Sequence, residues 1–150
     1  MANAKLGGKG SYGSGAYIEK LDSARTLAPG DSGKVFMLAN SGAISVTFPD
    51  ISNMSAQEKE AMIGWNATFI CQQSLSGGAA TVGCSSGDGN LLFGSSVGGD
   101  GGTGTGLNAV ADDINFTTGS VAGDMAKVIY DGTYYYAHAQ CADAAHITLD

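Results

Sequence analysis

The chain has 150 residues, a length that favours one domain with its own hydrophobic core. It carries 24 glycines, only 14% charged residues and a net charge of −7. Because phosphate binding needs clustered Lys and Arg, this composition argues against a nucleic-acid partner. No apolar run approaches the ~18 residues of a membrane span, and the first residues lack the apolar region of a secretory signal. We therefore expect neither a membrane partner nor secretion.

The basic residues gather at the start of the chain, whereas the remainder is acidic. Five of the seven basic residues lie in the first 34 positions: Lys5, Lys9, Lys20, Arg25 and Lys34. Two interpretations remain open, an arm that lies on an acidic surface or a solvated polar tail. We predict an extended N-terminal arm over residues 1–25 and a body over 26–150, with a strand possible at 17–21. The predicted contact residues of the arm are Lys5, Leu6, Lys9, Tyr12 and Tyr17.

Residues 30–49, GDSGKVFMLANSGAISVTFP, predict two strands and a turn. Residues 35–38 form a short apolar run, and Ile44, Val46 and Phe48 alternate with polar residues, which is typical of a half-buried strand. Asn40 and Gly42 supply the turn residues between them. The segment therefore reads as a hairpin.

One short helix follows. Ser55 and Glu58 fit the capping box at its start, and Gly64 is a suitable stop. A helix of about two turns is too short to stand alone, so we expect it to pack on the sheet through Ala61 and Met62.

Further strands are predicted from alternation at 65–72, 79–84 and 114–117, and from an apolar element at 91–93. The glycine-rich segment 94–106 reads as a loop, either mobile or held in place by a partner. Residues 127–137, KVIYDGTYYYA, predict a hairpin whose Asp131-Gly132 pair favours a type I′ turn. Residues 146–149 predict an edge strand.

Short strands at intervals of about ten residues, with glycine-rich turns and one helix, predict an all-β fold. The expected form is a mainly antiparallel small β-sandwich or barrel.

Two motifs in the chain carry no catalytic prediction. The GDSG sequence at residues 30–33 matches the surroundings of a trypsin-like nucleophile, but no histidine precedes His138, so a turn is the better interpretation. Residues 99–104 match GxGxxG without the strand and helix that a dinucleotide site requires. We predict no enzyme activity and no cofactor.

Metal and disulfide chemistry are also not expected. Acidic residues at 88, 100, 112, 113 and 124 form no calcium motif, and His138, Cys141 and His146 match no zinc spacing. Cys71, Cys84 and Cys141 are expected to be buried thiols.

Four aromatic residues are candidates for oligomer contacts or for surface recognition, for example of sugars. Tyr residues in strands more often pack in cores and interfaces, and alternation sends Tyr135 to the face opposite its neighbours. The candidates are Trp65, Tyr134, Tyr135 and Tyr136.

Three segments in this order, GDSGKVFMLANSGAISVTFP, GWNATFICQ and KVIYDGTYYYA, resemble a class of small virion proteins of tailed bacteriophages. The resemblance covers roughly residues 26–137, and the helix and the glycine segment depart from the usual pattern. It implies a capsid decoration (cement) protein, a head fibre or a tail fibre. The basic start of the chain and the lack of a repetitive shaft favour decoration, in which the protein binds the major capsid protein on the outside of the shell and stabilises it after synthesis in the host cytoplasm. A homotrimer is expected from capsid symmetry. A head- or tail-fibre module that binds host glycans is the alternative.

Overall fold

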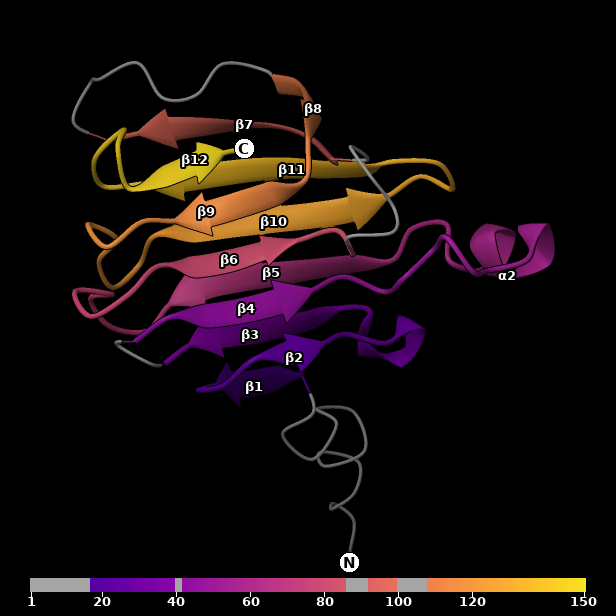
Figure 1. The fold of residues 1–150 in the computed structure, drawn as a ribbon, viewed down its shortest axis with the longest axis horizontal. Coiled ribbons are helices and arrows are strands. Elements are labelled where there is room, and N and C mark those ends of the chain that lie inside the picture. Colours follow the sequence, from indigo (N-terminus) through magenta and orange to yellow (C-terminus); the bar gives the residue numbers. More distant parts are fainter. Residues whose placement is uncertain (1–16, 40–41, 86–91, 100–107) are drawn as a thin grey trace, which may run out of the picture.

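The computed structural model describes residues 17–39, 42–85, 92–99 and 108–150. Two β-sheets lie face to face and enclose the core, which confirms the all-β class in its sandwich form (Figure 1). The predicted arm residues Lys5, Leu6, Lys9 and Tyr12 lie outside the described residues.

The strands divide into a seven-stranded and a five-stranded sheet. In spatial order, the first contains β1 (Ile18–Leu21), β3 (Lys34–Leu38), β5 (Asn66–Cys71), β10 (Met125–Tyr130), β11 (Tyr135–Cys141), β7 (Leu92–Gly98) and β8 (Asn108–Ala111). The second contains β12 (Ile147–Leu149), β9 (Asp113–Phe116), β6 (Ala80–Gly83), β4 (Ile44–Thr47) and β2 (Arg25–Thr26). A 3-10 turn, η2 (Pro29–Asp31), and a helix, α2 (Ala56–Ala61), complete the described elements.

The first six strands alternate between the two sheets. As a result, β1, β3 and β5 run parallel in one sheet, and β2, β4 and β6 run parallel in the other. Later strands add mostly antiparallel pairs, so the sheets are mixed. The prediction of a mainly antiparallel fold is therefore wrong. A chain that crosses the sandwich after each strand returns to the same sheet in the same direction.

The hairpin predicted over residues 30–49 is also wrong. Its two strands exist as β3 and β4, but they belong to opposite sheets. Both strands have one buried face, and alternation reports that burial without specifying the neighbouring strand. The GDSG turn before them is confirmed: η2 leads into Gly33, which has a φ of 83°.

Residues 17–25 belong to the body rather than to an arm. β1 pairs in parallel with β3, and Arg25 begins β2, which pairs with β4. The tentative strand at 17–21 is thus confirmed, and the body begins before residue 26.

Helix α2 starts and stops where predicted but does not pack on the sheet. The N–H of Glu58 donates to Ser55 Oγ, and the Glu58 carboxylate accepts from the N–H of Ser55 at 2.8 Å. Gly64 ends the segment with a φ of 88°. No residue of α2 is buried, and the helix projects from one end of the sandwich (Figure 1). Met62, which follows it, is buried as predicted, whereas Ala61 is exposed.

Residues 94–98 form part of strand β7, not a loop. β7 lies parallel to β11 from Leu92 to Gly98. A Cβ at Gly94 would lie 2.9 Å from the carbonyl oxygen of Ala137 and 2.9 Å from Leu149 Cδ2, so glycine is needed for this close approach. The glycines that indicated a loop thus permit a buried strand.

The hairpin of β10 and β11 is confirmed, but its turn is longer than predicted. Tyr130 pairs with Tyr135, which leaves a loop of residues 131–134. The Asp131 carboxylate accepts from the N–H groups of Thr133 and Tyr134 at 2.7 and 2.8 Å. An Asx-type loop therefore replaces the two-residue type I′ turn.

An aromatic cluster fills the core near one end of the sandwich. The Phe48 ring lies 4.8 Å from Tyr135, 6.0 Å from Trp65 and 6.2 Å from Phe69, measured between centroids. The Tyr135 hydroxyl donates to the carbonyl of Pro49 at 2.9 Å, and Trp65 Nε1 donates to that of Ala28 at 3.3 Å. Both sheets therefore share one core.

Candidate functional site

The outer side of the seven-stranded sheet carries side chains in three registered rows, which together we call the apolar face. One row contains Asn66, Ile129, Tyr136 and Phe93. The middle row contains Ile18, Val35, Thr68, Lys127, His138 and Ser95. The third contains Lys20, Met37, Ile70, Met125, Gln140 and Val97.

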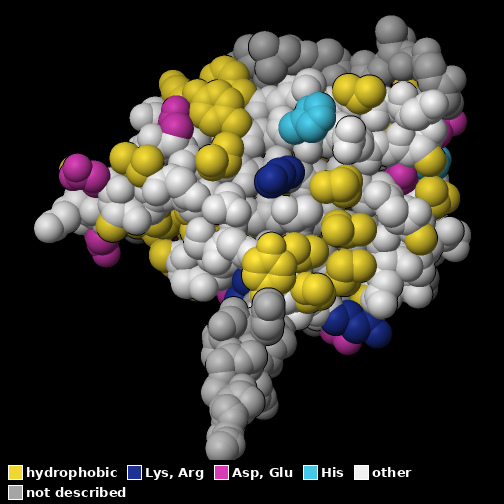
Figure 2. Space-filling model, turned by 180° about the vertical axis from the view of Figure 1, so that it is seen from behind, with side chains coloured by type: hydrophobic (Ala, Val, Ile, Leu, Met, Phe, Trp, Pro, Cys, Tyr) yellow, Lys and Arg dark blue, Asp and Glu magenta, His cyan; other side chains and the backbone are white. Residues whose placement is uncertain are grey.

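Large exposed hydrophobic side chains concentrate on this face. Ile18, Val97 and Ile129 are at least 50% exposed, and Tyr136 is 42% exposed. Tyr17, 58% exposed, precedes β1 at the same edge. The face seen in Figure 2 accordingly shows hydrophobic side chains grouped around a basic one. Exposed apolar side chains gathered on one face of a sheet are typical of interaction surfaces.

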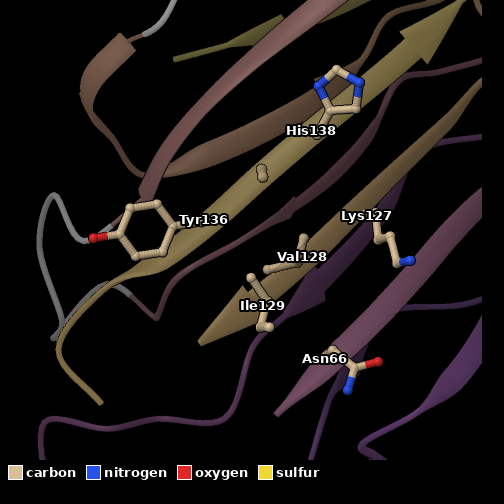
Figure 3. Close-up of a pocket in the computed structure, with 7 residues that line it drawn as sticks. Asn66, Lys127, Val128, Ile129, Tyr136 and His138 are labelled. Carbon is tan, nitrogen blue, oxygen red and sulfur yellow. The ribbon is translucent and has the colours of Figure 1, made fainter. Parts of the chain in front are cut away.

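A shallow hollow of about 400 Å³ lies on the apolar face over β5, β10 and β11. Figure 3 shows the side chains around it, which come from three adjacent strands. They are Asn66, Lys127, Val128, Ile129, Tyr136, Ala137 and His138. The hollow therefore combines an apolar floor with an amide, an ammonium and an imidazole at its rim.

Lys127 is the cation of this hollow. It lies on β10, the fourth of the seven strands, and its register neighbours are Thr68 and His138. None of the outward positions in the three rows is an Asp or Glu, and within the described ranges no ion pair joins Lys127 to a carboxylate. A positive charge that no described carboxylate pairs with thus stands near the centre of the face.

Tyr136, which lines the hollow, belongs to a group of three aromatic rings. Phe93 lies 4.8 Å from Tyr134 in an edge-to-face arrangement and 5.8 Å from Tyr136 in a stacked one. The Asp131 carboxylate fixes the loop beneath them, and the N–H of Tyr134 is the main reason that its pKa lies below the usual value. The rings are therefore held in place before any ligand binds.

The outer side of the five-stranded sheet is polar by contrast. Ser45, Thr81, Asn115 and Thr148 form one registered row across four strands, and Thr47 pairs with Thr26. A hydroxyl-rich face needs no partner to exclude water. The sandwich thus has two unlike sides, one suited to contact and one to solvent.

Four charged residues close the end of the sandwich at β1 and β2. Arg25 pairs with Glu19 and with Asp31, while Lys34 Nζ lies 2.9 Å from Glu19 and 2.7 Å from Asp31. Burial alone would raise the pKa of Asp31, but the Ala28 N–H and the two cations outweigh it and hold the pKa below its usual value. The charges balance one another, so this cluster is structural.

Two of the four aromatic candidates are not on the surface. Trp65 is 2% exposed and Tyr135 is fully buried, so the prediction that they contact a partner is wrong. Both belong to the inward face that alternation assigns to their strands. Tyr136 lies on the apolar face, and Tyr134 lies beside it in the loop.

The histidines and acidic residues of the predicted metal alternatives are dispersed. His138 is exposed on the apolar face, while His146 Nδ1 lies 2.7 Å from Asp124 Oδ2. Asp124 is 2% exposed and also accepts from the N–H groups of Val121 and Ala142. The part of the chain that the structure describes contains no metal-binding cluster of His, Cys, Asp and Glu. Asp88 and Asp100 lie outside that part.

The three cysteines are free thiols, and two of them, Cys71 and Cys141, are buried. Burial, followed by the nearby charge of Asp124, raises the pKa of Cys71 to about 12. Its thiol is therefore protonated and unreactive at neutral pH.

Sequence reasoning missed most of the apolar face. Lys127, Ile129 and Phe93 were placed in strands but not assigned a role. The available signal was the outward half of each alternation: Met125 and Ile129 occupy positions where a solvent-facing strand normally carries polar residues. Reading both faces of each strand, rather than the buried face alone, would have indicated this surface.

Comparisons with protein-family models, with characterised proteins and with solved structures find no match to this chain. Among the described residues, no helix has the length and apolar character needed to cross a membrane.

Proposed function

We propose that this chain is a capsid decoration protein of a tailed bacteriophage, which binds the major capsid protein on the outside of the shell and stabilises it. The work of such a protein is adhesion, and the proposal includes no catalytic step, metal or cofactor. The protein is made in the host cytoplasm and acts as part of the virion, as a homotrimer matched to capsid symmetry.

The unlike faces of the sandwich carry the proposal. A decoration protein needs one surface that adheres to the shell and another that meets solvent. The apolar face, with Ile129, Tyr136 and Val97 exposed, suits the first task. The row of Ser45, Thr81, Asn115 and Thr148 suits the second.

The start of the chain supports the same orientation. Residues 1–16 precede Tyr17, which is 58% exposed at the edge of the apolar face. The predicted contact residues Lys5, Leu6, Lys9 and Tyr12 precede this point in the sequence. Because β1 and β2 belong to the sandwich, the arm to be tested is 1–16 rather than 1–25.

The test uses capsids assembled without this protein. Purified chain is added, and bound protein is measured by co-sedimentation and located on the shell by cryo-electron microscopy. Ile129→Asp is expected to reduce binding, because it places a charge in the contact surface. The control Thr148→Asp, on the opposite face, is expected to bind normally. Wild-type protein that does not bind shells would exclude the function.

The arm is tested separately by deleting residues 1–16. Weaker binding with an unchanged unfolding transition is expected, because the deletion leaves every described strand intact. Undiminished binding would remove the arm from the proposal.

A fibre module that binds host glycans is the second candidate. The hollow beside Tyr136, with polar groups of Asn66 and His138 at its rim, favours it, since an exposed ring is a stacking surface for a sugar. Binding on a glycan array that Tyr136→Ala abolishes would support this function over decoration.

A further inference from the structure

We infer that the surface bound by the apolar face presents a carboxylate to Lys127, surrounded by apolar side chains. This inference rests on the proposed function, because it names the chemistry of the protein partner. It follows from the place of one cation in an otherwise uncharged part of the sheet.

The position of Lys127 makes its desolvation unavoidable when the face is covered. It lies on the fourth of seven strands, with Met125 and Ile129 two positions away on the same side of β10. Any partner that buries Met125, Ile129 and Tyr136 also removes water from the ammonium between them. A desolvated charge without a partner is costly, so productive contact requires an opposite charge.

Among the residues that the structure describes, no carboxylate supplies that charge. The neighbours of Lys127 across the strands are Thr68 and His138, and the diagonal positions are Asn66, Ile70, Tyr136 and Gln140. The cations at the β1 and β2 end of the sandwich differ: Arg25 and Lys34 each contact two carboxylates. Lys127 is therefore available to an acidic group from outside.

A second copy of this chain is the less suitable occupant. In a two-fold dimer formed by two apolar faces, an axis through Lys127 brings two ammonium groups together, and any other axis places Lys127 against rows that contain no Asp or Glu. Like charges in a desolvated contact oppose association. A different protein surface, with an acid among apolar residues, meets the charge and apolar requirements together.

The substitution Lys127→Met distinguishes the alternatives by the sign of its effect. It keeps the apolar stem and removes the charge. If the partner presents a carboxylate, that group loses its counterion in the variant. The Kd for capsids assembled without this protein then rises roughly thirty-fold or more. If the partner surface is neutral, the variant no longer desolvates an ammonium and binds as well as the wild type or more tightly.

Two further variants complete the test. Lys127→Arg keeps the charge, and its Kd is expected to lie within about three-fold of the wild-type value. Lys20→Met removes a cation from the edge strand of the same face, outside the hollow. It is also expected to change Kd by no more than about three-fold. Unchanged thermal unfolding of all three variants confirms that the fold is intact.

The outcomes separate the inference from the proposed function. If the wild type binds shells and Lys127→Met binds them equally well, the inference is wrong and the proposed decoration function stands. Wild-type protein that fails to bind shells overturns both. Competition by an acidic oligosaccharide, or a dimer in light scattering that Lys127→Met stabilises, would identify a different occupant and would also overturn the inference.

Discussion

At the scale of single residues, Asp31 ties together the closed end of the sandwich. Asp31 is 6% exposed, and its carboxylate accepts from Arg25, Lys34 and the Ala28 N–H. Because its folded pKa lies below the usual value, the stability it contributes is present above that usual value and is lost as pH falls through the folded pKa.

Asp31→Asn is therefore expected to lower the free energy of unfolding at pH 7 by about 1–3 kcal/mol. The difference in the free energy of unfolding between variant and wild type becomes smaller in acid, because the wild-type carboxyl then takes up a proton. Urea denaturation at pH 7 and near pH 3 measures both. Glu60→Gln on the exposed helix is the control, and a gap that is constant with pH would contradict the assignment.

Asp113 destabilises the folded state at neutral pH, in contrast to Asp31. Burial, followed by the charges of Asp112 and Asp150, raises its pKa in the folded state. A raised folded pKa gives stability that is fully present below the unfolded pKa and is lost as pH rises through the folded pKa. At neutral pH this carboxylate thus opposes folding.

Asp113→Asn is expected to raise the free energy of unfolding at pH 7, and with it the urea midpoint. The gain is up to about 1 kcal/mol because the site is partly solvated. The gain disappears below pH 4. Thermal unfolding of the two proteins across this range checks the sign, and a destabilised variant at pH 7 would show that the carboxylate makes a favourable contact.

At the scale of elements, Gly64 sets the direction in which the chain leaves α2 and enters β5. Its φ is 88°, and its N–H donates to the carbonyl of Tyr130 at 2.8 Å. The helix end is thereby fixed to the start of the β10–β11 loop.

Gly64→Ala is expected to destabilise the fold by about 1 kcal/mol, because alanine adopts a positive φ only with strain. Gly30→Ala is the matched control: its position has open space for a Cβ and no positive φ. Equal urea midpoints for the two variants would show that the conformation of Gly64 is not limiting.

The sequence indicated where most strands lie but not how they pair. Alternation at Trp65, Ala67, Phe69 and Cys71 correctly marked one buried face. The same signal could not show that β3 and β4 lie in opposite sheets, since a hairpin and a crossing bury the same residues. The capping box of Ser55 and Glu58 located α2, yet local capping says nothing about tertiary contacts. Most of the apolar face was missed because the prediction relied on aromatic residues, of which Trp65 and Tyr135 belong to the core and only Tyr134 and Tyr136 lie at the face.

At the scale of the whole molecule, one core joins both sheets. Phe48 follows β4 of the five-stranded sheet. Its ring contacts Trp65, which directly precedes β5 of the seven-stranded sheet, and Phe69, which belongs to β5. The two sheets are thus expected to unfold together.

Phe48→Ala is expected to reduce the free energy of unfolding by about 3–5 kcal/mol. Trp65 fluorescence and far-UV circular dichroism should report the same lowered midpoint. Phe93→Ala, which removes a ring from the outer face, is the control and is expected to cost less. Separate transitions for the two probes would contradict a shared core.

The alternating path of the first six strands has a consequence for biosynthesis. Ile18 awaits Val35 in its own sheet, and Val35 awaits Thr68, so each early segment must wait for a much later one to emerge. The local β10–β11 hairpin, which can form in microseconds, is translated after these strands. Until β5 has emerged, nascent chains therefore have open strand edges, and recovery of native protein is expected to depend on protection by chaperones.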